Sequence, residues 1–102
     1  MRRGELWLAE VGRKRRPVLL LTRSEVLVAR SLITVAEVTT TIRGLAAEVE
    51  IDHVEAGLDR PSVINCDGLH TIAQASLSSP VGHVGEDVMR KVCAAVSYAL
   101  GC

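Results

Sequence analysis

The densest charge in the chain is the basic run Arg13–Arg16, which Pro17 follows directly. Several like charges in a short run predict a local anion-binding site. Residues 1–43 carry nine Lys and Arg against four Asp and Glu, whereas residues 44–102 carry three against eight. The net charge of zero therefore combines a basic first part with an acidic second part.

The other reactive side chains show no pattern typical of a metal or disulfide site. The three histidines lack ligand spacing, and the three cysteines are odd in number with no C-x-x-C pair: they are His53, His70, His83, Cys66, Cys93 and Cys102. We therefore expect no metal and no cofactor, and a reducing, cytoplasmic compartment with Cys66 and Cys93 buried as small apolar residues.

The elements that must position the basic run are mainly short strands. Alternating or continuous apolar residues predict strands over 4–10, 16–21, 32–39, 48–51, 62–67 and 81–84, with 70–72 resuming the fifth after a break at Gly68. The strand that opens with Arg16-Pro17 is expected to be central and buried, since proline is tolerated at a first strand position. Residues 24–31 suggest a helical turn.

One convincing helix closes the chain. Gly85 is a possible N-cap, Glu86 and Asp87 suit the positive end of the helix dipole, and Gly101 suits the C-terminal cap. An apolar stripe at helical spacing includes Val88, Val92, Val96 and Ala99. The 102 residues are expected to form a single domain (1–102), mainly β with α, as a small barrel or rolled sheet. No apolar run is long enough for a membrane span or a secretory signal.

Several blocks of sequence, in order, resemble one known family. They are R-G-E-L-W at 3–7, R-P-V-L-L-L-T at 16–22, V-A-E-V-T at 35–39, S-V-I-N-C-D-G-L-H-T-I at 62–72 and E-D-V-M-R-K-V at 86–92. The chain resembles the MazF/PemK (Kid-like) toxins of type II toxin–antitoxin systems. The resemblance implies an SH3-like barrel (the CcdB/PemK-like fold) of about five to seven strands with a C-terminal helix, and a homodimer.

The resemblance also implies an activity and a partner. Members of the family are metal-independent, sequence-selective endoribonucleases that cut single-stranded regions of RNA (messenger, transfer or ribosomal) and so inhibit translation and growth. Their products end in 2′,3′-cyclic phosphate and 5′-hydroxyl. A cognate antitoxin neutralises them by laying an extended acidic segment over the RNA groove.

The family's catalytic arginine falls on Arg16 and its catalytic threonine on Thr39. A guanidinium matches phosphate oxygens in a fork, so transition-state stabilisation is the role expected of Arg16. Thr39 can hydrogen-bond a phosphate oxygen or orient the 2′-hydroxyl. Asp67 matches an aspartate proposed as the general base in some relatives, although an arginine beside it would weaken it as a base.

The sequence departs from the family after Asp67, where Gly68 and His70 replace polar residues common in relatives. His70 is therefore a further candidate for the acid or base, because histidine titrates near neutral pH. The loop between the first two strands is also short and basic. We expect RNA-phosphate contacts from Arg13, Lys14 and Arg15, with Arg43 as a further RNA-binding residue.

Two other interpretations stay open. One is a non-enzymatic CcdB-like toxin that acts on gyrase. Arg16 and Thr39 together argue against this interpretation, because a gyrase-binding protein does not need a pair of residues that hold a phosphate. The other is an inactive relative that still binds RNA or antitoxin, for which the changes at Gly68 and His70 leave room. A chain with one Trp, one Tyr and no Phe is poorly suited to binding RNA by stacking successive bases.

Overall fold

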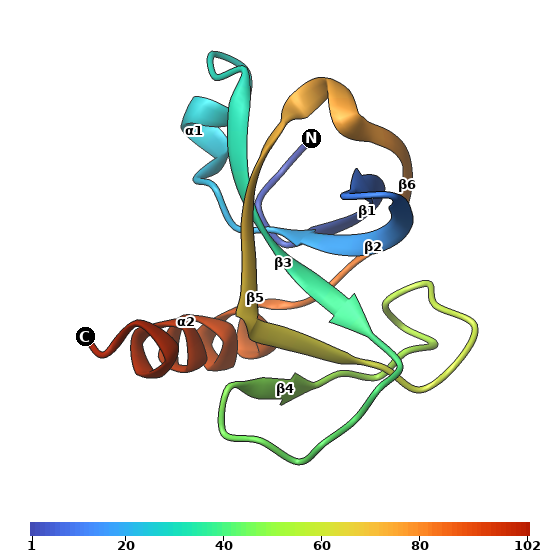
Figure 1. Cartoon of the computed structure of the whole chain (residues 1–102), viewed down its shortest axis with the longest axis vertical. Helices are drawn as coiled ribbons and strands as arrows, with labels where there is room; N and C mark the ends of the chain where they lie inside the picture. The colour runs from blue at the N-terminus through green and yellow to red at the C-terminus, as the bar shows by residue number, and fades with distance from the viewer.

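Six antiparallel strands and a C-terminal helix make up the computed structural model, which describes residues 1–102 (Figure 1). The strands are β1 (Glu5–Val11), β2 (Lys14–Leu20), β3 (Leu32–Thr39), β4 (Glu48–Glu50), β5 (Val63–Ala73) and β6 (Leu77–His83). The helices are the short α1 (Ser24–Leu27), the 3₁₀ turn η1 (Gln74–Ser76) and α2 (Glu86–Leu100). No helix is both long and apolar enough to cross a bilayer.

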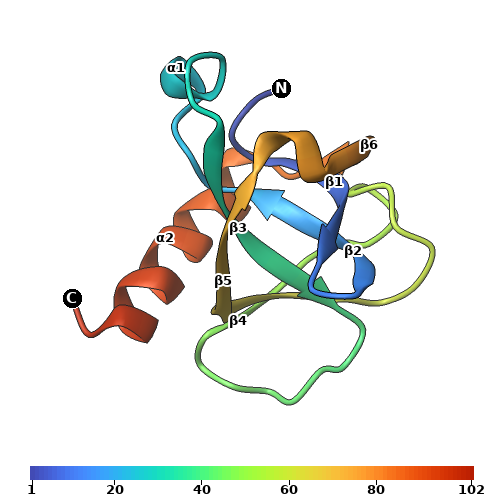
Figure 2. The same cartoon turned by 45° about the horizontal axis from the view of Figure 1, so that its top comes forward.

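The strands form one sheet in the order β4-β5-β3-β2-β1-β6, so β4 and β6 are its edges. The sheet twists strongly, and β2 runs across the long direction of β5 (Figures 1 and 2). The expected fold class, mainly β with five to seven strands and a C-terminal helix, is confirmed. The sheet is curled but open, because no ladder joins its two edge strands.

The two faces of the sheet bury separate apolar clusters. The larger one lies between the sheet and α2, and it includes Leu6, Leu19, Ile64, Cys66 and Val92. The smaller one lies on the opposite face, where α1 contributes, and it includes Val18, Leu20, Leu27, Ile33 and Val35. Successive strand residues point to opposite faces, so burial on both sides explains the continuous apolar run predicted to be a central strand.

The start of β2 corrects the sequence-based expectation. The strand begins at Lys14 rather than Arg16, and only Gly12 (φ 65°) and Arg13 turn between β1 and β2. A two-residue turn suffices between antiparallel neighbours, and Arg15 then pairs directly with Glu10, an opposite-charge pair that favours the longer ladder.

Pro17 therefore lies inside β2 rather than at its first position. The ladder between β2 and β3 covers only Val18–Leu20. At Pro17, β2 is therefore paired with β1 alone. The missing N–H donor of proline is tolerated there.

β5 is also longer than expected, because Gly68 does not end it. Glu37 of β3 pairs with Asn65, whereas its neighbour Ala36 pairs with Leu69, so three residues of β5 have no partner on β3. This bulge, residues 66–68, bends the strand and moves the later part of β5 relative to β3. The expected break is a bulge within one continuous strand.

The ends and caps of the C-terminal helix agree with those predicted from the sequence. Gly85 is the N-cap, Glu86 and Asp87 lie in the first turn, and Gly101 caps the end with a φ of 75°. α2 packs against β5 and β4, burying Val92 and Ala95.

The cysteines differ from each other in exposure. Cys66 is fully buried, whereas Cys93 is exposed, so the expectation that both are buried is wrong for Cys93. Cys93 lies on the outward side of α2, where its sulfur accepts a hydrogen bond from the Arg3 guanidinium at 2.9 Å. Burial, with smaller effects of the Asp67 and Cys93 charges, raises the pKa of the Cys66 thiol to about 11.

We expect iodoacetamide at pH 8 to alkylate Cys93 and Cys102 in the native protein and to leave Cys66 unmodified. The thiolate is the reactive form, and a pKa near 11 leaves only about a thousandth of the Cys66 thiol ionised at that pH. Intact-mass spectrometry should show two adducts in buffer and three in denaturant. A third adduct formed at the same rate in native protein would contradict the burial of Cys66.

Candidate active site: a basic groove across β2 and β3

Arg16 and Thr39 lie in one groove at the end of the β2–β3 pair. The groove has a volume of about 430 Å³, and its walls are the start of β2, residues 38–41 and the loop residues 58–62. Continuing the β2–β3 ladder by two residues beyond Val18 and Glu37 sets Arg16 opposite Thr39. The sheet register therefore brings together the two residues that the sequence predicts as the centre of the site.

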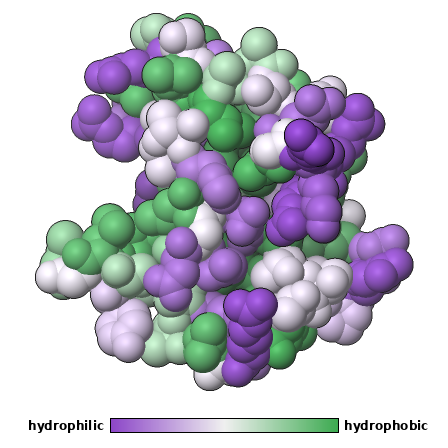
Figure 3. All heavy atoms as spheres, viewed as in Figure 1, coloured by the Kyte–Doolittle hydropathy of each residue, from purple (hydrophilic) through white to green (hydrophobic).

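The groove is strongly basic. Four cationic side chains, Lys14, Arg15, Arg16 and Arg60, line it, and Asp59 is its one carboxylate. Hydrophilic side chains gather over the centre and right of this face of the molecule (Figure 3). Such an excess of cations in a concave site attracts and holds a polyanion.

Hydroxyl groups line the groove beside the cations. The wall contains Thr39, Thr40, Thr41 and Ser62. The Thr39 oxygen accepts a hydrogen bond from the backbone N–H of Thr41 at 3.1 Å. This contact fixes the oxygen while leaving the hydroxyl proton of Thr39 available to a ligand.

Behind the groove, Arg16 pairs with a carboxylate that the sequence analysis missed. Its Nη1 atom donates to Glu37 Oε1 at 3.4 Å, and His70 Nε2 lies 3.3 Å from the same oxygen. The Glu37 side chain is 19% exposed, and those of Arg16 and His70 are 36% exposed. His70 Nε2 is itself buried and, in its present orientation, makes no hydrogen bond.

The period-two alternation of β3 could have revealed Glu37. Ile33 and Val35 share a face with it and belong to the smaller apolar cluster, so a glutamate at the next position on that face would need a cation beside it. Arg16 is that cation, one step beyond Val18 on the corresponding face of β2.

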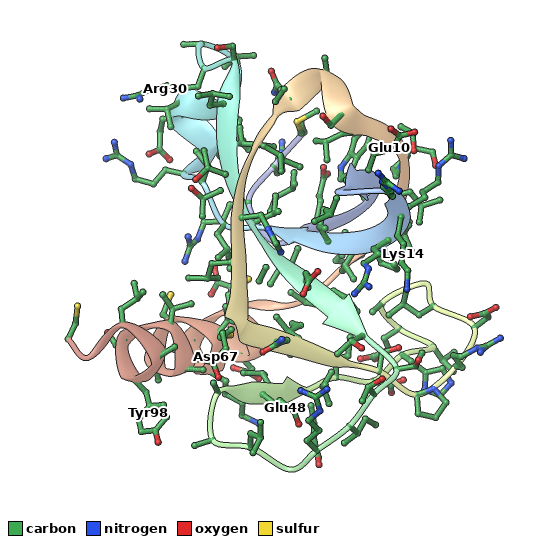
Figure 4. All side chains as sticks on the ribbon, in the orientation of Figure 1. Glu10, Lys14, Arg30, Glu48, Asp67 and Tyr98 are labelled. Carbon is green, nitrogen blue, oxygen red and sulfur yellow. The ribbon has the colours of Figure 1, made fainter.

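The other predicted site residues lie outside the groove. Asp67 is exposed in the β5 bulge, and Figure 4 shows it near α2, well apart from Lys14. No salt bridge joins Asp67 to Arg16, which pairs with Glu37 instead. Arg43 lies in the loop after β3, and Arg13 projects from the β1–β2 turn; neither lines the groove.

Two groove residues, Asp59 and Arg60, were also missed by the sequence analysis. They belong to residues 52–61, between two predicted strands, where the sequence predicts neither a helix nor a strand. Their side chains are 91% and 70% exposed, so their 3.9 Å ion pair contributes little to stability and leaves both free to meet a ligand.

Comparison with known proteins shows the family and the fold of the chain. The family model described as PemK-like, MazF-like toxin of type II toxin–antitoxin system matches residues 2–100. Probable endoribonuclease MazF5 of Mycobacterium tuberculosis is 37% identical over 103 residues, which cover 98% of this chain and 93% of that protein. The solved structure of M. tuberculosis toxin MazF-mt6 superposes with a TM-score of 0.89 at 38% identity, covering 95% of this chain and 96% of that one.

A mycobacterial endoribonuclease solved in complex with its cognate antitoxin shares the fold, with a TM-score of 0.89 at 22% identity over 99% of this chain and 95% of that one. The antiparallel sheet and the C-terminal helix are thus shared with solved toxin structures. The chain belongs to the PemK-like, MazF-like toxin family of type II toxin–antitoxin systems.

Proposed function

We propose that this protein is a metal-independent endoribonuclease toxin that cleaves single-stranded RNA in the groove, leaving 2′,3′-cyclic phosphate and 5′-hydroxyl ends and inhibiting translation. The observation that carries the proposal is the placement of Arg16 opposite Thr39 within a groove lined by four cations. The names of the relatives, endoribonucleases of M. tuberculosis, support the same activity.

The chemistry of such a cleavage suits these residues. The 2′-oxygen loses its proton and attacks phosphorus, the bond from phosphorus to the 5′-oxygen breaks, and the 5′-oxygen gains a proton. Negative charge accumulates on the non-bridging phosphate oxygens during this exchange. Arg16 would hold those oxygens through two parallel N–H donors, and the free hydroxyl proton of Thr39 would add a third.

The groove also indicates what it binds. Lys14, Arg15 and Arg60 line the same groove and would contact phosphates that flank the cleaved one, and such contacts would recognise backbone charge rather than base identity. Messenger, transfer and ribosomal RNA all present this chemistry in their single-stranded parts. The same cations suit an extended acidic antitoxin segment that would compete with RNA, and we propose that the toxin acts as a homodimer.

The deciding experiment is incubation of the purified protein with a defined single-stranded RNA in EDTA, followed by end-group analysis. We expect cleavage that EDTA does not stop, with 2′,3′-cyclic phosphate and 5′-hydroxyl termini. A gyrase supercoiling assay runs beside it. Inhibition of gyrase without RNA cleavage would replace this function with a CcdB-like one, and RNA binding without cleavage would define an inactive relative.

A salt titration tests the basic walls of the groove. For a single-stranded RNA, removing one cation that neutralises a phosphate lowers the slope of log affinity against log salt by about 0.7. We expect that reduction from Lys14→Ala, from Arg15→Ala and from Arg13→Ala in the adjoining turn, and none from Arg90→Ala, whose arginine lies on α2 outside the groove. If the slopes of log affinity against log salt for Lys14→Ala and Arg15→Ala equal that of the wild type, the groove does not bind the RNA backbone.

A further inference from the structure

Three strands contribute one ionisable side chain each to a cluster behind the groove. Arg16 comes from β2, Glu37 from β3 and His70 from β5, and both basic groups approach the same carboxylate oxygen, at 3.4 and 3.3 Å. Glu37 does not line the groove, whereas Arg16 does. Glu37 and His70 therefore do not contact a phosphate bound in the groove, and they act on it by positioning Arg16 and through the electric field of their charges.

Gly68 makes room for this arrangement. A Cβ atom at position 68 would lie 2.6 Å from Glu37 Oε2 and 3.0 Å from the side-chain nitrogen of Asn65. The Glu37 carboxylate thus occupies the space that any larger residue in the bulge would fill. Gly68 and His70 thus both lie against the same carboxylate.

The charge of the cluster depends on His70. With a neutral imidazole, the Arg16 and Glu37 charges cancel and the cluster carries no net charge. With a protonated imidazole, the cluster carries one positive charge, and Glu37 shares its charge between two cations. Histidine ordinarily changes its charge near pH 6.5, inside the physiological range.

We propose that Glu37 and His70 are positioning residues for Arg16: the Glu37 carboxylate holds the guanidinium at the groove, and protonation of His70 strengthens the hold of Arg16 on RNA phosphate. The proposal rests on the RNA-cleaving function proposed above. It assigns the histidine a role through Glu37, since His70 Nε2 is buried against that carboxylate rather than directed into the groove.

Few other charges face His70. Glu37 on β3 is the one charged side chain within salt-bridge distance, and Arg16 on β2 lies on the other side of that carboxylate. On β5 itself the nearest charged residue in sequence is Asp67, which is exposed and forms no ion pair. The other two histidines, His53 and His83, lie outside both the cluster and the groove.

The test measures the affinity of a non-cleavable RNA, 2′-deoxy at the scissile position, from pH 5.5 to pH 8.5, together with single-turnover cleavage of the all-ribose RNA. We expect wild-type affinity to rise about fivefold as the pH falls through the range of histidine titration, because the cluster gains a positive charge. His70→Gln should abolish this rise. His83→Gln, the same change at an exposed histidine, should retain it.

Glu37→Gln separates positioning from a merely structural role. Loss of the carboxylate removes negative charge beside the phosphate, so at pH 8 the non-cleavable RNA should bind about fivefold more tightly. The cleavage rate should nevertheless fall about tenfold, because the ion pair that aims Arg16 is gone. A purely structural residue would weaken both. In Gly68→Ala, the closest atoms to the added Cβ are the ends of the flexible Glu37 and Asn65 side chains, so this variant should fold. It should displace the Glu37 carboxylate and lower the rate of RNA cleavage as well.

Two results would overturn the inference: a pH dependence that persists in His70→Gln, or a Glu37→Gln protein that binds RNA no more tightly than wild type at pH 8. Failure of the proposed function is a different result, namely a wild type that binds the RNA but cleaves none at any pH. In that case the measurements of RNA affinity against pH still test the roles of Glu37 and His70. A wild type that does not bind single-stranded RNA at all would reject both.

Discussion

Arg16→Ala is expected to slow RNA cleavage by about 10²–10³-fold, the typical cost of removing one preorganised donor from a developing oxyanion. The Arg16 guanidinium forms an ion pair with the half-buried Glu37 carboxylate, and it lies opposite Thr39 in the sheet. Thr39→Ala removes a single neutral donor, so its expected loss is about tenfold. Single-turnover rates with one defined RNA measure both effects.

Two further variants make the Arg16 experiment specific. Arg16→Lys retains the charge but not the two-pronged fork, so its rate should lie between those of the wild type and Arg16→Ala. Arg90→Ala removes an arginine whose ion pair with Asp87 lies exposed on α2, and it should cleave like the wild type. Thermal melts verify that each variant is folded. Full activity in a folded Arg16→Ala protein would remove the proposed site.

Gly82→Ala is expected to lower the free energy of unfolding by about 2–3 kcal/mol. A Cβ atom at this position in β6 would overlap the carbonyl oxygen of Ala56 and lie 3.2 Å from the backbone nitrogen of Gly57. Both obstacles are backbone atoms, which cannot rotate away as a side chain can. The melting temperature should fall by about 10 °C or more, since about 4–8 °C is lost per kcal/mol in a domain of this size.

This contact also matters for activity. The segment that packs on Gly82 continues into Leu58–Ser62, which forms one wall of the groove. At temperatures where the Gly82→Ala protein is still folded, it should therefore cleave RNA more slowly than the wild type. Gly85→Ala is the matched control, because nothing lies within 4 Å of its added Cβ, and its cost should be about 1 kcal/mol or less. Equal melting temperatures for the two variants would show that β6 and this segment do not pack tightly.

Much of the fold was predictable because the evidence for it is local. The strand from 32 to 39 and the helix from 86 to 100 agree with their patterns, since β-branched alternation and cap residues act over a few positions. The start of β2 was misplaced because a basic run and a proline suggest a loop. Its ladder depends on residues of the neighbouring strand, such as Glu10 opposite Arg15.

The candidate site was predictable only in part for a similar reason. Arg16 and Thr39 were indicated by resemblance, and the sheet register places them together. Glu37 was missed because its partners, Arg16 and His70, lie on two other strands. His70 reaches it only because the three-residue bulge shifts the pairing of β5. Register across a bulge is a property of the whole sheet, which a pattern along one strand does not contain.

The two free edges of the open sheet bear on how the protein behaves in a crowded cell. Unpaired edge strands are templates onto which other chains can add, the first step of edge-to-edge aggregation. β4 has only three residues, and two of them, Glu48 and Glu50, are charged. The opposite edge, β6, contains Pro80, which has no N–H to offer an incoming strand. The protein therefore needs no partner to cover either edge in order to remain dispersed.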